Sequence, residues 1–308
     1  MTLNRASFVV LQFLDENVVK RLFYGVDGID ELSELEDTKK HWVIGDVNVP
    51  ITKDNGREFE TYKTYWNNPY IGLRALVSYF TDLFNIPIHF LHFGPFYKNS
   101  TNDSRRAVDW VMSRQCSVNS FMIHGHHVDD EIVHYTLNNC QFTEYNTPTS
   151  PTFRRSLKYH LKSVEIYNAP WITVENLIEL DCCELSITES RLTSEDINRF
   201  LRNWARGGSP RLRSLFMGTM TKLEKLTDGL YVKEVSREEK KEYFTWVSLF
   251  FSFFTTLYYR NSERQQTIKD SWDIKRDDLR VASIVKNDGI STFFTMVVWP
   301  DFYGNLSV

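Results

Sequence analysis

Short apolar frames recur along the middle of the chain, each with apolar residues at its first, fourth and sixth positions. The fourth and sixth side chains point to the same face of an extended strand, because side chains alternate along a strand. Five stretches fit the frame: residues 88–93, 118–123, 161–166, 182–187 and 212–217. Their first residues lie 30, 43, 21 and 30 positions apart. We therefore expect five strands, with the polar stretch 143–155 as an exposed loop inside the longest interval.

Helical patterns separate these frames, as is expected where successive strands run parallel and the chain must return between them. The clearest helix is predicted over residues 194–206, where four apolar residues share one face: Ile197, Phe200, Leu201 and Trp204. Thr193 and Asp196 form a capping-box pattern before it, and Gly207 stands where a helix ends. Similar spacing predicts helices around residues 73–84 and 128–137.

Strand patterns mark both ends of the chain. Residues 8–13 and 42–49 are predicted strands near the N-terminus. Near the C-terminus, residues 281–285 and 292–299 alternate around Asn287, Asp288 and Gly289, which predicts a terminal β-hairpin that caps the sheet. Together these patterns predict an α/β fold: a degenerate leucine-rich-repeat-like solenoid of strands and helices, with extra β elements at both ends.

This organisation predicts three segments. Residues 1–60 form an N-terminal β-containing segment, residues 61–225 the repeat-like α/β region, and residues 226–308 a C-terminal segment that includes the hairpin. The C-terminal segment contains an aromatic run, residues 243–259, with no charged side chain. We interpret this run as a core strand or helix; the alternatives are a membrane span at the lower limit of length and a translated intron.

Charge and cysteine content narrow the function classes. The formal charge is −4, so no overall positive field attracts nucleic acid or anionic lipid, and we expect neither as a partner. The four cysteines show no metal-binding spacing and are interpreted as small buried apolar residues. The N-terminus shows no secretion signal, which favours an intracellular location, cytoplasmic or nuclear.

Candidate chemistry is confined to two clusters. The first is a group of imidazoles with ligand atoms suited to zinc or iron: His124, His126, His127 and His134. Solvated loop and helix-cap histidines are the alternative, and we assign no metal or cofactor. The second cluster is basic, and either meets an acidic protein partner or is a solvated helix face: Arg199, Arg202, Arg206, Arg211 and Arg213. Since there is no nucleophile elbow and no phosphate-binding loop, the sequence predicts no catalytic residue and no enzyme.

Two stretches resemble a known family. The run from Asn198 through Phe200 to Trp204, with Gly207 and Leu212 after it, resembles the type 2 F-box-associated domain of nematode F-box proteins. The similarity covers about residues 153–220. A second run, residues 273–278, resembles that family's terminal segment, with Leu279 in the place of a glycine. Members of the family usually begin with an F-box, a helical hook that binds the Skp1 adaptor of a cullin ubiquitin ligase.

The resemblance implies a non-catalytic module for protein–protein interaction, with substrate recognition of the F-box and ubiquitin-ligase type. No F-box pattern is found at the start of this sequence, so Skp1 and cullin binding is an open question, and the target protein is unknown. Two other hypotheses remain. One is a metal-dependent hydrolase that uses the His124 to His134 cluster, and the other is a decaying family copy without a function.

Overall fold

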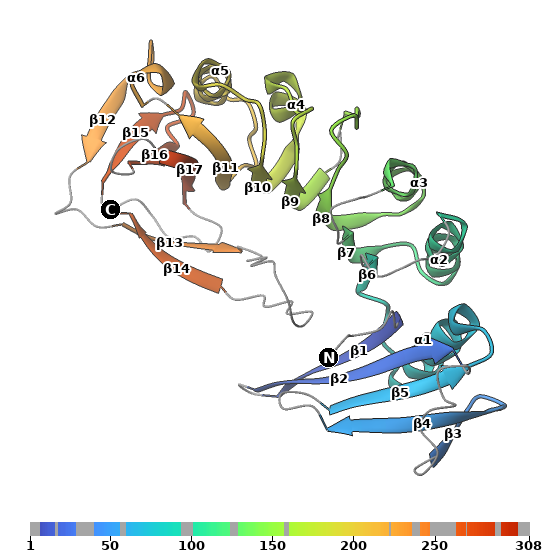
Figure 1. Cartoon of the computed structure of the whole chain (residues 1–308). Helices are drawn as coiled ribbons and strands as arrows, with labels where there is room; N and C mark the ends of the chain where they lie inside the picture. The colour runs from blue at the N-terminus through green and yellow to red at the C-terminus, as the bar shows by residue number, and fades with distance from the viewer. Residues whose placement is uncertain are drawn as a thin grey trace. The chain divides into compact units, whose positions relative to one another are not determined.

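The computed structural model describes residues 7–15, 18–28, 40–55, 60–93, 101–123, 129–156, 160–221, 223–235, 241–246, 263–268, 270–286 and 291–300. Within these ranges the chain is a mixed α/β protein (Figure 1). It divides into two compact units. Unit 1 comprises residues 1–117 and 134–140, and unit 2 comprises residues 118–133 and 141–308.

A five-stranded sheet occupies the first part of unit 1. Its strand order is β1-β2-β5-β4-β3. The strands are β1 (Ser7–Asp15), β2 (Val18–Gly28), β3 (Lys40–Ile44), β4 (Val47–Asn55) and β5 (Glu60–Trp66). The strand predicted over residues 8–13 is confirmed as part of β1. The single strand predicted over residues 42–49 is wrong, because Ile44 pairs with Val47 across a tight turn, and Gly45 has the positive φ of 62° that such a hairpin favours.

Helix α1 (Pro69–Phe84) confirms the helix predicted around residues 73–84. The side chain of Asn68 caps its first turn by accepting hydrogen bonds from the backbone N–H groups of Tyr70 and Ile71. Leu76 and Phe80 lie in the buried core of this unit, together with residues of the sheet. Strand β6 (Phe90–Phe93) confirms the first apolar frame, and α2 (Thr101–Arg114) is a helix that the sequence did not predict.

Five neighbouring parallel strands form one part of the sheet in unit 2. They are β7 (Val118–Ile123), β8 (Phe142–Pro148), β9 (His160–Tyr167), β10 (Asp181–Thr188) and β11 (Ser214–Thr221). The apolar frames of this region are thereby confirmed as strands β7, β9, β10 and β11. Helices α4 (Val174–Glu179) and α5 (Ser194–Ala205) connect successive strands and lie on the same side of the sheet (Figure 1). Helix α3 (Asp130–Asn139) confirms the helix predicted around residues 128–137, and its residues belong to both units.

Strand β8 corrects the prediction of an exposed loop over residues 143–155. Phe142 follows Val118 by 24 residues and precedes Leu161 by 19, so the long interval contains one further strand. Tyr145, Asn146 and Thr147 are buried in it. The stretch is polar in sequence because the buried Thr147 stands in register with Ile166 of the next strand, and the buried Asn146 stands in register with Glu165.

In-register rows of apolar side chains build the core of unit 2. One row crosses six strands: Phe121, Tyr145, Val164, Leu185, Leu215 and Met296. All six are buried. Because side chains alternate along each strand, the residues between them belong to the other face of the sheet.

The C-terminal strands continue the same sheet beyond β11. Strand β17 (Ser291–Trp299) pairs with β11 in antiparallel orientation, and the order then runs β17-β16-β15-β12. These strands are β16 (Val281–Val285), β15 (Ser271–Lys275) and β12 (Val232–Val235). The antiparallel pair β16 and β17 confirms the predicted hairpin, although β15 and β12 extend the sheet past it, and its turn at residues 287–289 lies outside the described residues.

The aromatic run 243–259 is described only at its start. Residues 243–246 belong to β13 (Lys241–Trp246), which pairs with β14 (Glu263–Ile268), and residues 247–259 lie outside the described part of the chain. Among the described helices, none combines the length and the apolar character that crossing a membrane requires. The short helix α6 (Leu223–Leu226) follows β11.

Candidate functional site

Helix α5 has one fully buried face. Ile197, Phe200, Leu201 and Trp204 are at most 1% exposed, as their spacing predicted. At its start, Thr193 Oγ1 accepts the backbone N–H of Asp196, and the Asp196 carboxylate accepts the backbone N–H of Thr193. This is the predicted capping box. The chain leaves the helix at Gly207 with a φ of 101°, so the predicted end is confirmed as well.

The buried asparagine of α5 explains one polar position of the family-like motif. Asn198 Nδ2 donates to the backbone carbonyls of Leu226 and Asp228 at 2.8 and 2.9 Å. Both carbonyls belong to the turn after β11, around α6. A single side-chain amide therefore links α5 to a segment about thirty residues later. An apolar side chain of the same size would leave both carbonyls without this hydrogen-bond donor.

The second family-like stretch, residues 273–278, packs against the first. The Arg276 guanidinium carbon lies 5.7 Å from the centre of the Trp204 ring, and Arg276 Nη1 donates to the carbonyl of Gly208. The backbone N–H of Asp277 donates to the carbonyl of Ala205. The two stretches that carry the resemblance are thus neighbours in unit 2.

The side chains that alternate with the apolar rows along each strand lie on the opposite face of the sheet, and most of them are polar. Glu144, Ser163, Glu184 and Ser214 occupy one row across β8 to β11. In the next row, the Glu165 carboxylate is only 6% exposed and accepts hydrogen bonds from Asn146 Nδ2 at 2.7 Å and Tyr167 Oη at 2.8 Å. These donors supply part of the solvation that a buried carboxylate loses.

Two phenylalanines interrupt this polar face. Phe216 of β11 and Phe293 of β17 stack with ring centroids 5.4 Å apart. Phe293 is 49% exposed, and it stands in register with Gly218 and, through it, Thr188. A half-buried ring stacked on an exposed one, beside small residues, has the character of an anchor point for a protein partner.

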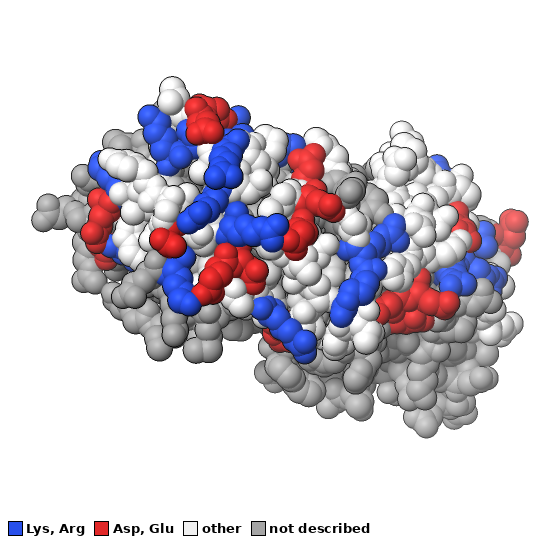
Figure 2. Space-filling model, turned by 90° about the horizontal axis from the view of Figure 1, so that it is seen from above, with Lys and Arg blue, Asp and Glu red and all other residues white. Residues whose placement is uncertain are grey.

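The predicted arginine cluster makes mainly contacts within the chain. Arg199 pairs with Glu175 at 2.5 Å, and Arg202 donates to the carbonyl of Asp228 at 2.8 Å. Arg211 pairs with Asp181 at 3.4 Å, Arg213 donates to the carbonyl of Pro300 at 3.3 Å, and Arg206 is exposed. Figure 2 shows basic and acidic side chains interspersed over the face that it presents, without a broad field of one sign among the described residues.

Of the four histidines in the other cluster, only His134 falls within the described residues, where it is half-buried in α3. His124, His126 and His127 lie outside them. Throughout the described ranges, no group of three or more His, Cys, Asp or Glu side chains is placed to hold a metal ion.

The cysteines differ from their predicted uniform burial. Cys140 and Cys182 are buried, whereas Cys183 is half-buried and Cys116 is exposed after the end of α2. Burial raises the pKa of the Cys140 thiol to about 11, and burial likewise raises the pKa of Cys182. The prediction is therefore wrong for Cys116, because the segment between α2 and β7 lies at the surface.

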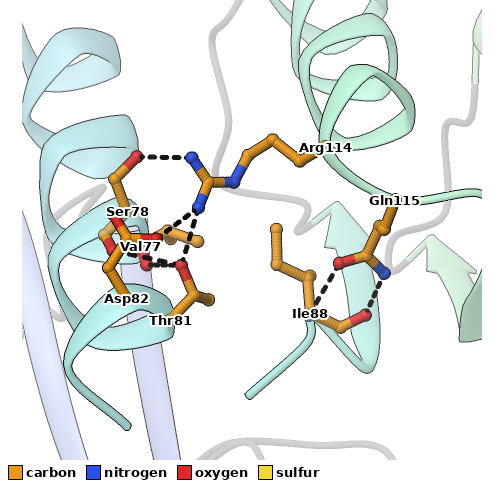
Figure 3. Close-up of polar contacts among 7 residues, drawn as sticks. All are labelled: Val77, Ser78, Thr81, Asp82, Ile88, Arg114 and Gln115. Carbon is orange, nitrogen blue, oxygen red and sulfur yellow. Dashed lines mark hydrogen bonds and ion pairs between the residues drawn. The ribbon is translucent and has the colours of Figure 1, made fainter. Parts of the chain in front are cut away.

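A contact region between α1 and α2 of unit 1 was not predicted from the sequence. Arg114 Nη2 donates to Asp82 Oδ1 at 2.9 Å and Thr81 Oγ1 at 3.1 Å, so the end of α2 is tied to α1 (Figure 3). Gln115 bridges to the backbone N–H and carbonyl of Ile88. The sequence signal for these contacts is the four-residue spacing of Arg106, Trp110 and Arg114, which places them on one face of α2.

These features define a mixed α/β protein whose unit 2 combines parallel strands, connecting helices and a hairpin in one sheet. Residues 152–217 match the family model described as F-box associated, so this part of the chain is similar to that family. The match confirms the resemblance predicted over about residues 153–220. The comparisons with curated proteins and with solved structures gave no match.

Proposed function

We propose that the chain is a protein-recognition module of the F-box associated type, which binds a target protein in the manner of a ubiquitin-ligase substrate receptor. The observation that carries this proposal is the match over residues 152–217. Contacts of the motif residues support the proposal, because Asn198 links α5 to the segment around α6, and Trp204 is fully buried. Both contacts hold α5 in place within unit 2.

We further propose that β7 to β11 and their helices form a degenerate leucine-rich-repeat-like solenoid. Support comes from the parallel pairing of successive strands and from the apolar row that crosses them. In proteins built from stacked repeats, the sheet provides an extended binding surface. We therefore assign target binding to the part of this face formed by β11 and β17, where Phe293 is exposed, with Phe216 and Phe293 as its aromatic anchors.

The proposed target-binding surface is tested by replacing one exposed aromatic residue inside it and one outside it. Full-length chain is immobilised, proteins bound from a cell extract are identified by quantitative mass spectrometry, and Phe293→Ser is compared with Tyr231→Ser. Tyr231 is 88% exposed and lies before β12, away from the proposed anchors. Bound proteins should be lost with Phe293→Ser and retained with Tyr231→Ser. Equal retention by both variants would refute this placement of the surface.

The ligase connection is a separate part of the proposal. Skp1 and a cullin should be recovered with the full-length protein when it is isolated from cells, which would also agree with the proposed cytoplasmic or nuclear location. If a target is recovered without the adaptor, target recognition stands and the ligase role is withdrawn.

A further inference from the structure

Arginine and aromatic side chains alternate in a continuous stack between α1 and α2 of unit 1. The guanidinium carbon of Arg106 lies 4.6 Å from the centre of the Tyr70 ring, and that of Arg74 lies 5.9 Å from the same ring. Arg74 also lies 5.2 Å from the centre of the Trp110 ring, and Arg114 lies 5.4 Å from it. We call this set, Arg106, Tyr70, Arg74, Trp110 and Arg114, the arginine ladder.

Helical spacing creates the ladder. Tyr70 and Arg74 are four residues apart on α1, and Arg106, Trp110 and Arg114 follow at four-residue steps on α2, so each set shares one helix face. Arg74 and Arg106 are exposed, while the two rings are half-buried. Each ring contacts two guanidinium groups, which leaves little room for a nucleobase to stack on it.

Arg114 and Arg74 of the ladder differ in their partners. Arg114 is paired with Asp82, as Figure 3 shows. Asp109 accepts a hydrogen bond from Tyr135 Oη at 2.6 Å. Arg74 has no ion pair or hydrogen bond in the part of the chain that the structure describes. Its N–H groups are therefore available to an anion in solution.

We propose that the arginine ladder binds a phosphorylated peptide segment of a partner protein. A phosphate monoester carries a charge of about −1.5 to −2 and three acceptor oxygens, which suit the paired N–H donors of guanidinium. Stacking against Tyr70 and Trp110 holds Arg74 in place before binding, so less side-chain entropy is lost. The ladder lies outside residues 152–217, so this inference does not rest on the function proposed above.

The test uses the full-length chain and three peptide libraries with randomised flanks, which carry phosphoserine, serine or glutamate at the fixed central position. Binding is measured by fluorescence polarisation in 150 mM salt. We expect the phosphoserine library to bind at least tenfold more tightly than either of the others. Equal binding of all three, or tighter binding of a thymidine 20-mer, would overturn the proposal without any need for a variant.

Substitutions then locate the site. Arg74→Gln combined with Arg106→Gln should weaken binding of the phosphoserine library at least tenfold, whereas Arg191→Gln, at an exposed arginine of unit 2, should leave it unchanged. Circular dichroism and thermal melting verify that the double variant is folded. If it is not folded, Arg74→Lys replaces it, since this keeps the charge and removes the guanidinium fork; several-fold weaker binding is expected. Unchanged binding by a folded variant would place the site elsewhere.

Discussion

Leu279 occupies a backbone conformation that leucine seldom adopts. Its φ is 71°, it is 70% exposed, and it stands where the resemblance over residues 273–278 predicted a glycine. The turn before β16 therefore retains the geometry that glycine favours while carrying a side chain that resists it. A left-handed conformation costs a non-glycine residue roughly 1–2 kcal/mol, and glycine in turn loses about 0.5–1 kcal/mol of backbone entropy on folding.

Leu279→Gly should consequently stabilise the protein by about 0.5–1 kcal/mol, because relief of the strained φ exceeds the entropic cost. Urea unfolding followed by circular dichroism measures the change. Val47→Gly is a suitable comparison, because Val47 is also exposed but lies in β4 and does not have a positive φ, so it should destabilise. A loss of stability with Leu279→Gly would show that the leucine side chain contributes more than the backbone strain removes.

Cys140 links burial to stability at alkaline pH. Burial raises its pKa from an ordinary 9.0 to about 11. The unfolded chain therefore loses this proton as pH rises past 9, while the folded chain retains it up to about 11. The stabilisation from the buried thiol is present in full below pH 9 and falls as pH rises between those two values.

Urea midpoints measured between pH 8.5 and 10.5 test this reasoning. The wild-type midpoint should fall more steeply over this range than that of Cys140→Ala, which lacks the titrating group. Cys116→Ala should follow the wild type, because Cys116 is exposed. Parallel curves for the wild type and Cys140→Ala would mean that the thiol does not resist ionisation in the folded state.

At the scale of the element, helix α5 depends on its reciprocal cap. Thr193→Ala removes a hydroxyl that satisfies the Asp196 N–H and should cost about 1 kcal/mol of unfolding free energy. Thr193→Ser keeps the hydroxyl and should lose only a small part of this. Thermal denaturation of both variants gives the comparison. If the alanine and serine variants have the same melting temperature, then the hydroxyl contributes nothing, and burial of the apolar face alone determines where the helix begins.

The elements that could be predicted from the sequence are those whose signals are local. Helix α5 carries its cap, its apolar face and its terminating glycine within fifteen residues, and the frames of β7, β9, β10 and β11 combine alternation with aliphatic side chains. Strand β8 lacks such a signal. Its buried Asn146 is satisfied by Glu165 on the neighbouring strand, and this contact exists only after the sheet has formed.

Helix α2 and the contacts of the basic cluster could not be predicted from the sequence, because they too depend on residues that are distant along the chain. Few apolar residues of α2 are buried, Val108 and Val111 among them. Polar and charged side chains make other contacts of this helix, such as Arg114 with α1 and Asp109 with Tyr135 of α3. In the basic cluster, Arg213 likewise donates a hydrogen bond to a distant group, the carbonyl of Pro300, which lies 87 residues later. Residue type and spacing identify such side chains, whereas their partners depend on the fold.

At the scale of the whole molecule, the family-like region is only part of a larger cooperative structure. Within unit 2, β9 pairs with β8 on one side and β11 pairs with β17 on the other. Asn198 and Trp204 find their partners in segments that follow residue 217. The matched residues therefore supply the middle of a sheet whose hydrogen bonds and core are completed by sequence on both sides.

A fragment of residues 152–217 should accordingly fail to fold, whereas a fragment of residues 118–308 should fold. In the shorter fragment, β9 and β11 would expose unpaired strand edges, and the carbonyls bonded to Asn198 would be absent. Dispersed amide signals in a proton–nitrogen NMR spectrum and a cooperative urea transition are expected for the longer fragment alone. A cooperative transition in the shorter one would mean that β8, β17 and Arg276 contribute little to its stability.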